Sequence, residues 1–445
     1  MNRRRFSRVM AGAIGASAVV PDTLSSSLTR GLGPAQEQPR INAPRLNGWL
    51  TQMSSFGRRT DGGVDRLAFS DADIEGRSFL RSLMVEAGLE VRVDLVGNIF
   101  GRLPGSSQGL SPIWVGSHID SVPAGGNYDG PLGTLGALEA VRALREWGVQ
   151  PRHPIDVVAF VNVVGGKTGS RVLAGEFRQE VLQLLSTSGY TIEEGIRRLG
   201  GDPGRLGEAR IEPGAVAGFL ELHVEQGAVL ERSGVQIGVV EGIVGIRRWT
   251  AVVRGSANHA GTTPMDQRQD AMVGAARRVE AVNRVVRSIP GSQVATVGRI
   301  QASPGAPNVI PGEVTLTIEI RALGMDRIQE VLDGISQEAR AIGEENGTPI
   351  ELHEFYLSAA APTDERFRRW VEEAAQGLRL THRRMPSGAG HDAQAVAHFA
   401  PMGMVFVPSI GGLSHHPDEY SRPEDVEAGV NVLLGALLKA DAELD

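Results

Sequence analysis

The pattern of hydrophobic and polar positions predicts a first region in which helices and buried strands follow one another. Apolar residues recur at helical spacing over residues 73–91 and 131–148. Residues 111–122 and 155–164 instead carry near-continuous apolar runs, which are typical of strands buried on both faces. Strand, helix and strand in this order indicate a parallel sheet with crossover helices, whose ligands gather beyond the carboxyl ends of the strands.

The pattern changes near residue 246, where shorter alternating segments begin. Four of these segments predict strands, and one long amphipathic segment predicts a helix; the strands are residues 247–256, 293–303, 313–323 and 350–357, and the helix is residues 325–346. The first pattern then returns with an apolar strand at 402–409 and a final helix after residue 423. We therefore expect an α/β domain interrupted by an inserted α+β domain.

The length of 445 residues also favours two domains, because a single hydrophobic core rarely grows that large. The expected boundaries are a leader and linker over 1–44, the first part of the α/β domain over 45–245, the inserted domain over 246–358, and the second part of the α/β domain over 359–445.

Composition restricts the possible chemistry. A hydrophobic content of 41% and a charged content of 22% are typical of a soluble globular protein. The net charge of −7, with Arg spread along the chain, gives no reason to expect a nucleic acid partner. The chain has no cysteine, which excludes disulfides, thiolate metal ligands and cysteine nucleophiles. Any metal must therefore be held by His, Asp and Glu.

The N-terminus has the features of an export signal. Arg3 and Arg4 precede a weakly apolar stretch over residues 9–20, the arrangement of a twin-arginine (Tat) signal, and residues 22–45 are rich in Ser, Pro and Gln. The stretch is too short for a stable membrane span. We expect an exported, periplasmic protein; the alternative is a basic N-terminus on a cytoplasmic protein.

Six of the ten histidines lie in short polar turns next to Gly, Ser or Pro. These are His118, His223, His259, His391, His415 and His416. His118 is followed eleven residues later by Asp129, and His223 ends the apolar segment 217–225. Imidazole and carboxylate suit Zn²⁺ or Mn²⁺, and three protein ligands with an open position activate water. The three residues are therefore candidate ligands of one ion.

Six successive motifs identify the chain as similar to the M20 metallohydrolases, in their carbamoylase and allantoate amidohydrolase branch. They are GSHIDSVPAGGNYDGPLG, ELHVEQG, ANHAGTTPMDQRQDA, PNVIPGEVTLTIEIR, SGAGHDAQ and LSHHPDEYS. The resemblance implies hydrolysis of carbamoyl, ureido or amide C–N bonds in small substrates such as N-carbamoyl-L-amino acids or allantoate. It also implies a zinc-peptidase-like catalytic domain and an inserted lid domain through which two chains form a homodimer.

The resemblance assigns roles to particular residues. His118, Asp129 and His223 resemble the first metal site, with Asp129 bridging, and His415 resembles a ligand of the second site. The remaining matches concern the substrate: His259 resembles a lid histidine that stabilises the oxyanion in the partner subunit's site, Asn308 and Arg321 resemble carboxylate-binding residues, and Gln226 and His391 resemble further pocket residues.

The chain departs from the family at Val163 and Val164, where two consecutive glutamates are expected. The first glutamate would be the general base and the second a ligand of the second metal. We therefore expect one tightly bound ion, a weakened second site and impaired catalysis. Two other interpretations stay open: a non-catalytic protein that binds a small molecule, and a peptidase or aminoacylase of the same superfamily.

Residues 166–168, Gly-Lys-Thr, follow this position and match the end of a phosphate-binding loop. That loop also needs a glycine five positions earlier, where the chain has Val161. We therefore interpret the segment as the altered remainder of the loop that carries the glutamates in the family.

Overall fold

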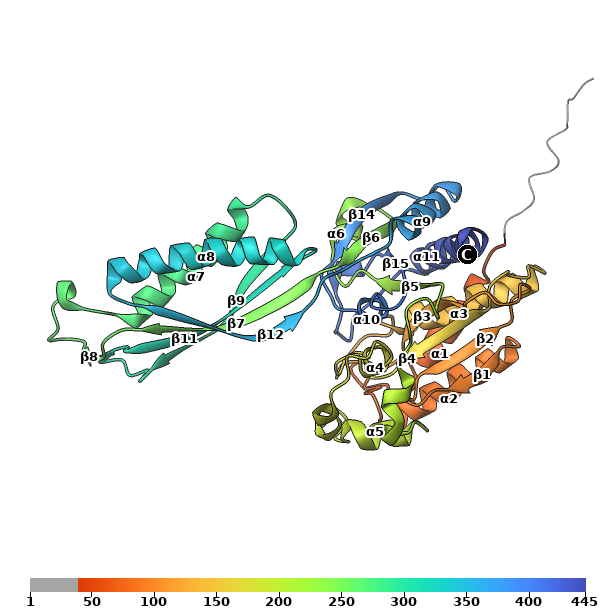
Figure 1. Ribbon diagram of the computed structural model, residues 1–445, viewed down its shortest axis with the longest axis horizontal. Coiled ribbons are helices and arrows are strands. Elements are labelled where there is room, and N and C mark those ends of the chain that lie inside the picture. The colour runs from red at the N-terminus through yellow and green to blue at the C-terminus, as the bar shows by residue number, and fades with distance from the viewer. Residues whose placement is uncertain (1–38) are drawn as a thin grey trace, which may run out of the picture. The chain divides into compact units, whose positions relative to one another are not determined.

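The computed structural model describes residues 39–445, and Figure 1 shows their arrangement. The expected Tat signal and most of the expected linker lie outside the described residues. Within residues 39–445, no helix combines the length and the apolar character that a membrane span requires.

The larger domain contains a nine-stranded sheet. Its strands are β1 (Glu90–Val93), β2 (Ile99–Leu103), β3 (Ile113–His118), β4 (Ile155–Phe160), β5 (Gly218–Val224), β6 (Ile237–Ile243), β13 (Ala361–Pro362), β14 (His382–Ser387) and β15 (Met402–Val407). Their order is β1-β2-β4-β3-β5-β15-β6-β13, and β14 also pairs with β6.

The predicted parallel arrangement is found in the four central strands of this sheet, and β14 also runs parallel to β6. The neighbours β4, β3, β5 and β15 run parallel, whereas β2 is antiparallel to β4 and β6 is antiparallel to β15. The short connection between β1 and β2 holds no crossover helix, so these two strands form an antiparallel pair. The central strands therefore follow the predicted parallel arrangement, and antiparallel pairs extend the sheet on both sides.

Helices cover both faces of the sheet. One face packs against α1 (Ala43–Met53), α2 (Asp71–Glu86), α3 (Pro131–Glu146), α9 (Glu365–Gly377) and α11 (Pro423–Glu443). The other face carries shorter elements: α4 (Thr168–Leu173), α5 (Ile192–Arg198), α6 (Val229–Ser233), α10 (Asp392–Val396) and the 3-10 helices η1 (Gln179–Gln183), η2 (Pro203–Ala209) and η4 (Ile410–Gly412).

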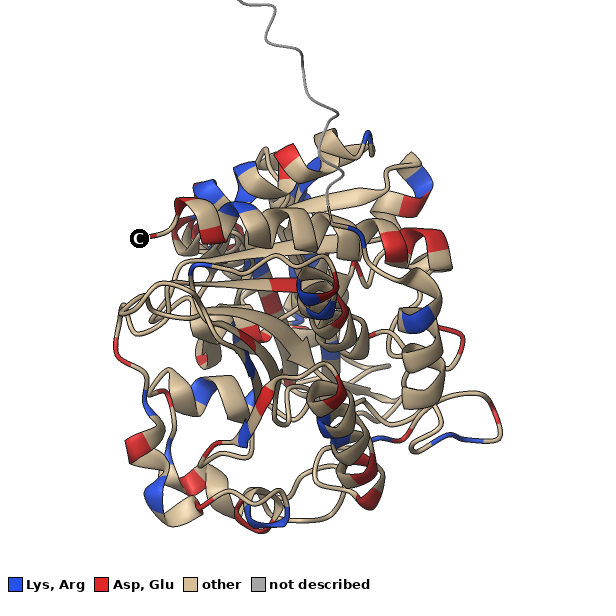
Figure 2. Ribbon diagram, turned by 90° about the vertical axis from the view of Figure 1, so that its right-hand side faces the viewer, with Lys and Arg blue, Asp and Glu red and all other residues tan. Residues whose placement is uncertain are grey.

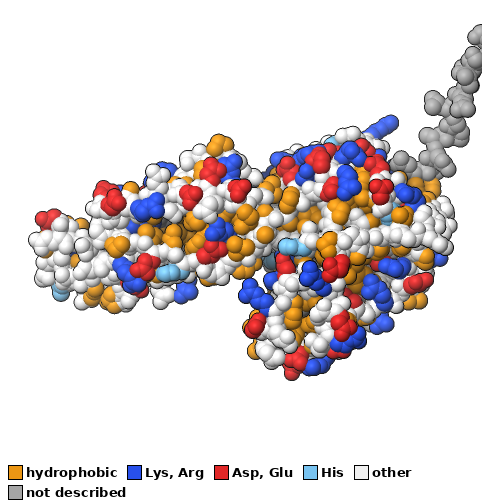
Figure 3. Space-filling model, viewed as in Figure 1, with side chains coloured by type: hydrophobic (Ala, Val, Ile, Leu, Met, Phe, Trp, Pro, Cys, Tyr) orange, Lys and Arg blue, Asp and Glu red, His pale blue; other side chains and the backbone are white. Residues whose placement is uncertain are grey.

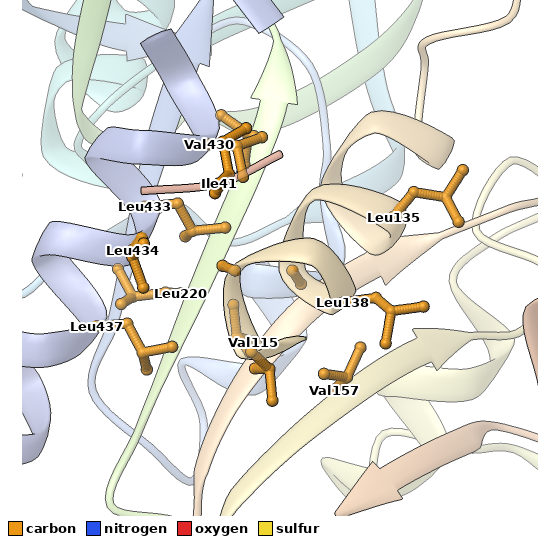
Figure 4. Packing of buried hydrophobic residues seen from close by; sticks show 14 of the residues in the cluster. Ile41, Val115, Leu135, Leu138, Val157, Leu220, Val430, Leu433, Leu434 and Leu437 are labelled. Atoms are coloured by element: carbon orange, nitrogen blue, oxygen red, sulfur yellow. The ribbon is translucent and has the colours of Figure 1, made fainter. Parts of the chain in front are cut away.

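The long helices α3 and α11 form the main core with the central strands. Figure 4 shows Leu138 of α3 and Leu437 of α11 beside Val115, Val157 and Leu220 of the sheet, and all five side chains are fully buried. Full burial of a leucine or valine side chain contributes about 1.5 to 3 kcal/mol. The continuous apolar runs of the central strands are thus explained by helices on both faces.

The predicted helix over residues 73–91 ends earlier than expected. Helix α2 stops at Glu86, Gly88 adopts a φ of 73°, and β1 begins at Glu90. A left-handed glycine ends the helical hydrogen bonding, and the residues after it pair with β2. Periodicity alone did not separate the helix from the strand.

The inserted domain, called the lid below, is a four-stranded antiparallel sheet covered by two helices. Its strands are β7 (Gly245–Arg254), β9 (Val294–Ser303), β11 (Glu313–Ala322) and β12 (Ile350–Ser358), in the order β12-β7-β11-β9. The helices α7 (Ala271–Ser288) and α8 (Met325–Asn346) pack on the sheet through a core that includes Trp249, Val314 and Ile328. A small ladder of β8 (Asn258–His259) and β10 (Val309–Ile310) and the 3-10 helix η3 (Met265–Gln267) complete it. The structure therefore confirms the expected fold class, an α/β domain with an inserted α+β domain.

Charged side chains of both signs are interspersed over the outer helices. Figure 2 shows basic and acidic residues side by side, and pairs such as Arg142 and Glu146 on α3, 3.0 Å apart, are one helical turn from each other. On the described surface, this mixture produces no extended field of one sign in the view of Figure 2.

Candidate metal centre

The candidate site lies at the carboxyl ends of the four parallel strands. β3 ends at His118, β5 carries His223 as its penultimate residue, and β15 leads into the loop that carries His415. β4 leads into the turn of Val163 and Val164. Adjacent parallel strands thus bring residues that are almost 300 positions apart to one edge of the sheet, as expected for this topology.

Asp129 lies at the centre of three imidazoles. Its Oδ1 is 3.1 Å from Nε2 of His223 and 3.5 Å from Nε2 of His118, and its Oδ2 is 2.9 Å from Nε2 of His415. The ligand atoms of His118, Asp129 and His223 all lie within 4.8 Å of one another. One carboxylate oxygen therefore faces a pair of histidines while the other faces the third.

The second nitrogen of two of these rings is held by the backbone. Nδ1 of His118 lies 3.0 Å from the carbonyl oxygen of Asp120, and Nδ1 of His223 lies 2.9 Å from that of Val224. A carbonyl accepts, so each Nδ1 carries a hydrogen, and the Nε2 atom that faces Asp129 is the one that would bind a metal once its proton is released. This donor set fits a divalent ion such as Zn²⁺ or Mn²⁺.

The electrostatics of the cluster point the same way. Burial opposes the charged form of Asp129, but its contacts with the three imidazoles reverse that effect and hold the pKa of the carboxyl well below its usual range. Burial likewise disfavours the charged form of His118, yet Asp120 and Asp129 raise its pKa well above the ordinary value. The site is built around a negative charge that attracts cations.

A glycine allows the Asp129 loop to approach His118. Gly130 has a φ of 85°, and a Cβ atom at this position would lie 2.4 Å from Cε1 of the His118 ring. Any side chain at position 130 would displace the imidazole of His118. The close packing therefore explains why a glycine follows Asp129. Helix α3 begins directly after it, at Pro131.

The turn that replaces the expected glutamates is compact. The backbone N–H groups of Val163 and Val164 each donate to the carboxylate of Asp120 over 3.3 Å, and Val163 belongs to the hydrophobic core with 9% of its surface exposed. The amide of Asn162 donates to the Thr168 hydroxyl over 2.8 Å and closes the turn. Neither valine can accept a proton or bind a metal.

The Gly-Lys-Thr segment lies in this turn and does not form the nucleotide-binding loop that its sequence partly matches. The side chain of Lys167 donates to Oε1 of Gln394, and Thr168 is buried against Asn162. These contacts agree with its interpretation as an altered loop.

Beside the metal cluster is a cleft of about 730 Å³. Gln226, His415 and Arg321 line it together with Gly388 and Ala389. Nε2 of Gln226 donates to Oδ2 of Asp129 over 2.9 Å, so this side chain connects the cleft to the cluster. Arg321, near the end of β11 in the lid, bonds the carbonyl of Gly388 through Nη1 and pairs with Glu319.

Three of the residues assigned by resemblance do not line this cleft. His259 and Asn308 are exposed and adjacent to each other, because the N–H of Ala260 donates to the carbonyl of Asn308. They belong to the β8 and β10 region, at the end of the lid far from β5 (Figure 1). His391 is only 2% exposed, and its ring packs against that of His223 with centroids 4.5 Å apart.

The carboxylates around the centre that the sequence analysis missed include Asp120, Glu419 and Glu221, and Glu221 lies within 4.8 Å of the ring nitrogens of His223 and His391. Asp120 holds both His118 and the valine turn, as described above. Glu419 is 4% exposed and accepts the N–H groups of Tyr128 and Asp129 at Oε1 and the hydroxyl of Ser414 at Oε2. It therefore joins the loop of Asp129 to the loop of His415. Asp120 and Glu419 belong to motifs already singled out, SHIDS and SHHPDE, which was the available signal.

Comparisons with known proteins agree with this architecture. The profile of peptidase family M20/M25/M40 matches residues 114–439. An N-carbamoyl-L-amino-acid amidohydrolase of Paenarthrobacter aurescens is 38% identical, over 90% of this chain and 99% of its own length. A ureidoglycolate hydrolase of Arabidopsis thaliana is 36% identical, over 90% of this chain and 87% of its own length.

Solved structures give the same result. An amidase of the hydantoinase/carbamoylase family from Burkholderia multivorans superimposes with a TM-score of 0.84 and 36% identity, covering 91% of this chain and 99% of the other. With the profile match over most of the chain and relatives that align almost end to end, the chain belongs to peptidase family M20/M25/M40, in the branch of the N-carbamoyl-L-amino-acid amidohydrolases.

Proposed function

We propose that the chain is a metal-dependent hydrolase that cleaves a carbamoyl, ureido or amide C–N bond in a small amino-acid-like substrate. The observation that carries this proposal is the cluster of His118, Asp129, His223 and His415 at the mouth of a cleft that also contains Arg321. Relatives that align with about nine tenths of the chain are named for N-carbamoyl-L-amino acids and ureidoglycolate.

The chain's own residues supply the binding and positioning steps. His118, Asp129 and His223 would hold a Zn²⁺ or Mn²⁺ ion, which when bound acidifies water and polarises a carbonyl. Arg321 offers a guanidinium at the other end of the cleft, where it can pair with the carboxylate of an amino-acid-like substrate. Gln226, bonded to Asp129, has its amide at the boundary between the metal and the substrate.

The missing glutamates set the expected rate. A positioned general base contributes about 10² to 10⁴ in rate. The carboxylate that contacts the turn is that of Asp120, and its two oxygens already accept the N–H groups of Val163 and Val164. We therefore propose a slow hydrolase. The same observation favours the second candidate, a protein that binds the substrate without cleaving it.

The metal content should reflect the uneven ligand sets. One site has His118, Asp129 and His223, while the other retains only Asp129 and His415, whose side chain is 54% exposed. We expect about one tightly bound divalent ion per chain after dialysis, measured by elemental analysis. Two tight ions would mean that another ligand replaces Val164.

The lid should pair two chains in a homodimer. His259 and Asn308 lie at the lid end far from the metal cluster, so they can serve a site only in a neighbouring chain (Figure 1). Figure 3 shows apolar side chains on the surface of the lid. Val273, Val294 and Ile300 are each about half exposed and supply surface for the contact. Light scattering at micromolar concentration should give the mass of a dimer; a strict monomer would remove His259 as an oxyanion donor.

The decisive experiment separates a hydrolase from a binding protein. Purified protein loaded with Zn²⁺ or Mn²⁺ is assayed for ammonia or amino-acid release from N-carbamoyl-L-amino acids, allantoate and ureidoglycolate. Slow turnover that is lost in His118→Ala supports the hydrolase. Calorimetric binding without turnover, abolished in Arg321→Ala, supports the binding protein, and neither binding nor turnover on any of these substrates contradicts both.

Export is a separate proposal that rests on the twin arginine alone, Arg3 and Arg4. The Tat route carries folded proteins, which suits a metal centre assembled before transport. Fractionation of cells that express the full chain tests it: the protein should appear in the periplasm, and an Arg3→Lys, Arg4→Lys variant should stay in the cytoplasm.

A further inference from the structure

A second cavity, of about 610 Å³, lies beside the altered turn. Lys167 and Arg171 line it from the turn and from α4, and Ser358 and Ala359 line it from the end of β12. Its remaining wall includes Gln394 of α10. The substrate cleft borders the same segment of chain a few residues earlier, at Gly388 and Ala389. The two cavities are therefore separate but share a wall.

The charges around this second cavity are predominantly positive. Lys167, Arg171 and Arg178 line it, and Glu176 is the one carboxylate among its lining residues. Glu176 is already engaged, since its oxygens lie 3.1 Å from Nε of Arg171 and 2.9 Å from Nε2 of His398. Arg178 forms no ion pair with any residue in the range 39–445. Lys167 and Arg178 thus form no direct ion pair with a residue of the cavity wall, and the buried carboxylate of Asp392, which favours the charged form of Lys167, lies outside that wall.

Lys167 has donors to spare. Its ammonium donates one hydrogen bond, 2.5 Å long, to Oε1 of Gln394, whereas an ammonium carries three N–H donors. The side chain is half-buried, and burial lowers the pKa of the amine. Its backbone is left-handed, with a φ of 59°, a conformation that costs energy in a non-glycine residue and is over-represented at functional sites.

We propose that this cavity is a second ligand site, which binds a small anion carrying a carboxylate or phosphate group through Lys167, Arg171 and Arg178. Such an anion supplies the counter-charge that the protein lacks there and accepts the unused hydrogen bonds of Lys167. Phe177 and Tyr356, which also line the cavity, give it an apolar side that accommodates the body of an organic anion.

The anion would also act on the connection to the lid. Nε2 of Gln394 donates to the hydroxyl of Ser358 and, over 2.6 Å, to the carbonyl of Ala359, directly after the last lid strand. Oε1 of the same amide accepts from Lys167. An anion that draws the Lys167 ammonium away from Gln394 removes one hydrogen bond of that amide. Because Gln394 also bonds the residues at the end of β12, the anion would affect the connection to the lid.

The chain offers an unusually clean probe, because Lys167 and Lys439 are its only lysines. Expression with lysine that carries ¹⁵N at Nζ labels both ammonium groups without altering them, and NMR then follows each signal while inorganic phosphate or acetate is added at low salt. Lys439 on α11 pairs with Glu373 and does not line the cavity, so it is the internal control. Loss of one signal in Lys167→Met assigns the other.

We expect the Lys167 signal to shift and saturate while the Lys439 signal stays constant. Calorimetry on unmodified protein should show affinity for the same anion that falls about tenfold in Lys167→Met and in Arg178→Ala, the effect of losing one charge-assisted contact. Arg197→Ala, which removes an exposed arginine outside the cavity, should leave the affinity unchanged. Arg321→Ala should leave the anion-induced shift of the Lys167 signal unchanged, which separates this site from the substrate cleft.

Comparison of the two titrations, with phosphate and with acetate, identifies the chemical class of the ligand. Tighter binding of phosphate assigns a phosphate site, and tighter binding of acetate assigns a carboxylate site. The proposal is overturned if neither anion shifts the Lys167 signal, if both lysines shift in parallel as on a general surface, or if Lys167→Met and Arg178→Ala bind as well as the unmodified chain.

Discussion

Replacement of Val163 and Val164 by glutamate should increase the rate of hydrolysis at least about a hundredfold, the lower end of what a general base contributes. The turn is tied to the cluster, because the N–H groups of both valines bond the carboxylate of Asp120, whose carbonyl oxygen also accepts from His118. The measurement is kcat/KM for N-carbamoyl-L-amino acids and allantoate, together with the metal content of the variant.

The two single variants should separate the gain in rate from the gain of the second metal ion. Val163→Glu alone should return most of the rate, and Val164→Glu alone should return the second ion without the base. The matched control is the double variant Val163→Gln, Val164→Gln. Glutamine has the size of glutamate without its charge, so the rate of hydrolysis should increase little in this control. Val163 is almost buried, so circular dichroism must show that each variant is folded. A double variant that is folded and no faster than the original chain would refute this account of the valines.

The candidate metal centre could be predicted from the sequence to a large extent, because its ligands follow recognisable strands. His118 and His223 stand at the carboxyl ends of apolar segments, and such ends converge in a parallel sheet. Asp129 could also be predicted, since the glycines around it allow its loop to approach His118 closely. What made these residues predictable is that backbone direction alone brings them together.

Residues that act through the ligands were not predictable in the same way. Glu419 accepts hydrogen bonds from the backbone N–H groups of Tyr128 and Asp129, almost 300 residues away. The hydrophobic pattern near Glu419 does not indicate such a contact. The burial of His391 behind His223 is equally a product of packing. Its place in a glycine-rich turn resembles that of a pocket residue, although the ring contacts another ring instead of the cleft.

The elements missed in the fold have a similar cause. Helix α7, between residues 271 and 288, mixes arginine with alanine and valine and was not separated from its surroundings, yet Asp270 caps its first turn by accepting from Met272. Strand β14, rich in arginine, is defined by its pairing with β6. In both cases tertiary contacts select the structure where the hydrophobic pattern is weak.

Asp129→Asn should abolish tight metal binding. The substitution keeps the size of the side chain and removes the charge that three imidazoles surround, so both ions lose their shared ligand. Even a partner outside the direct ligands costs about 10- to 100-fold in metal affinity, and a bridging carboxylate should exceed the upper end of that range. Elemental analysis after dialysis should find almost no metal in the variant, and hydrolysis should fall with it.

A second measurement separates loss of metal from loss of fold. A ligand that binds only the folded chain at a hundred times its Kd adds about 2.7 kcal/mol of stability, so Zn²⁺ or Mn²⁺ should raise the Tm of the original chain but not that of Asp129→Asn. Asp418→Asn is the matched control, since this carboxylate is 78% exposed, lies three residues from His415 and contacts only His416 among the imidazoles. It should keep both the ion and the metal-dependent rise in Tm. If Asp129→Asn retains a tight ion and the same rise, the metal is held elsewhere, and the cluster around Asp129 is an ion-paired structural centre instead.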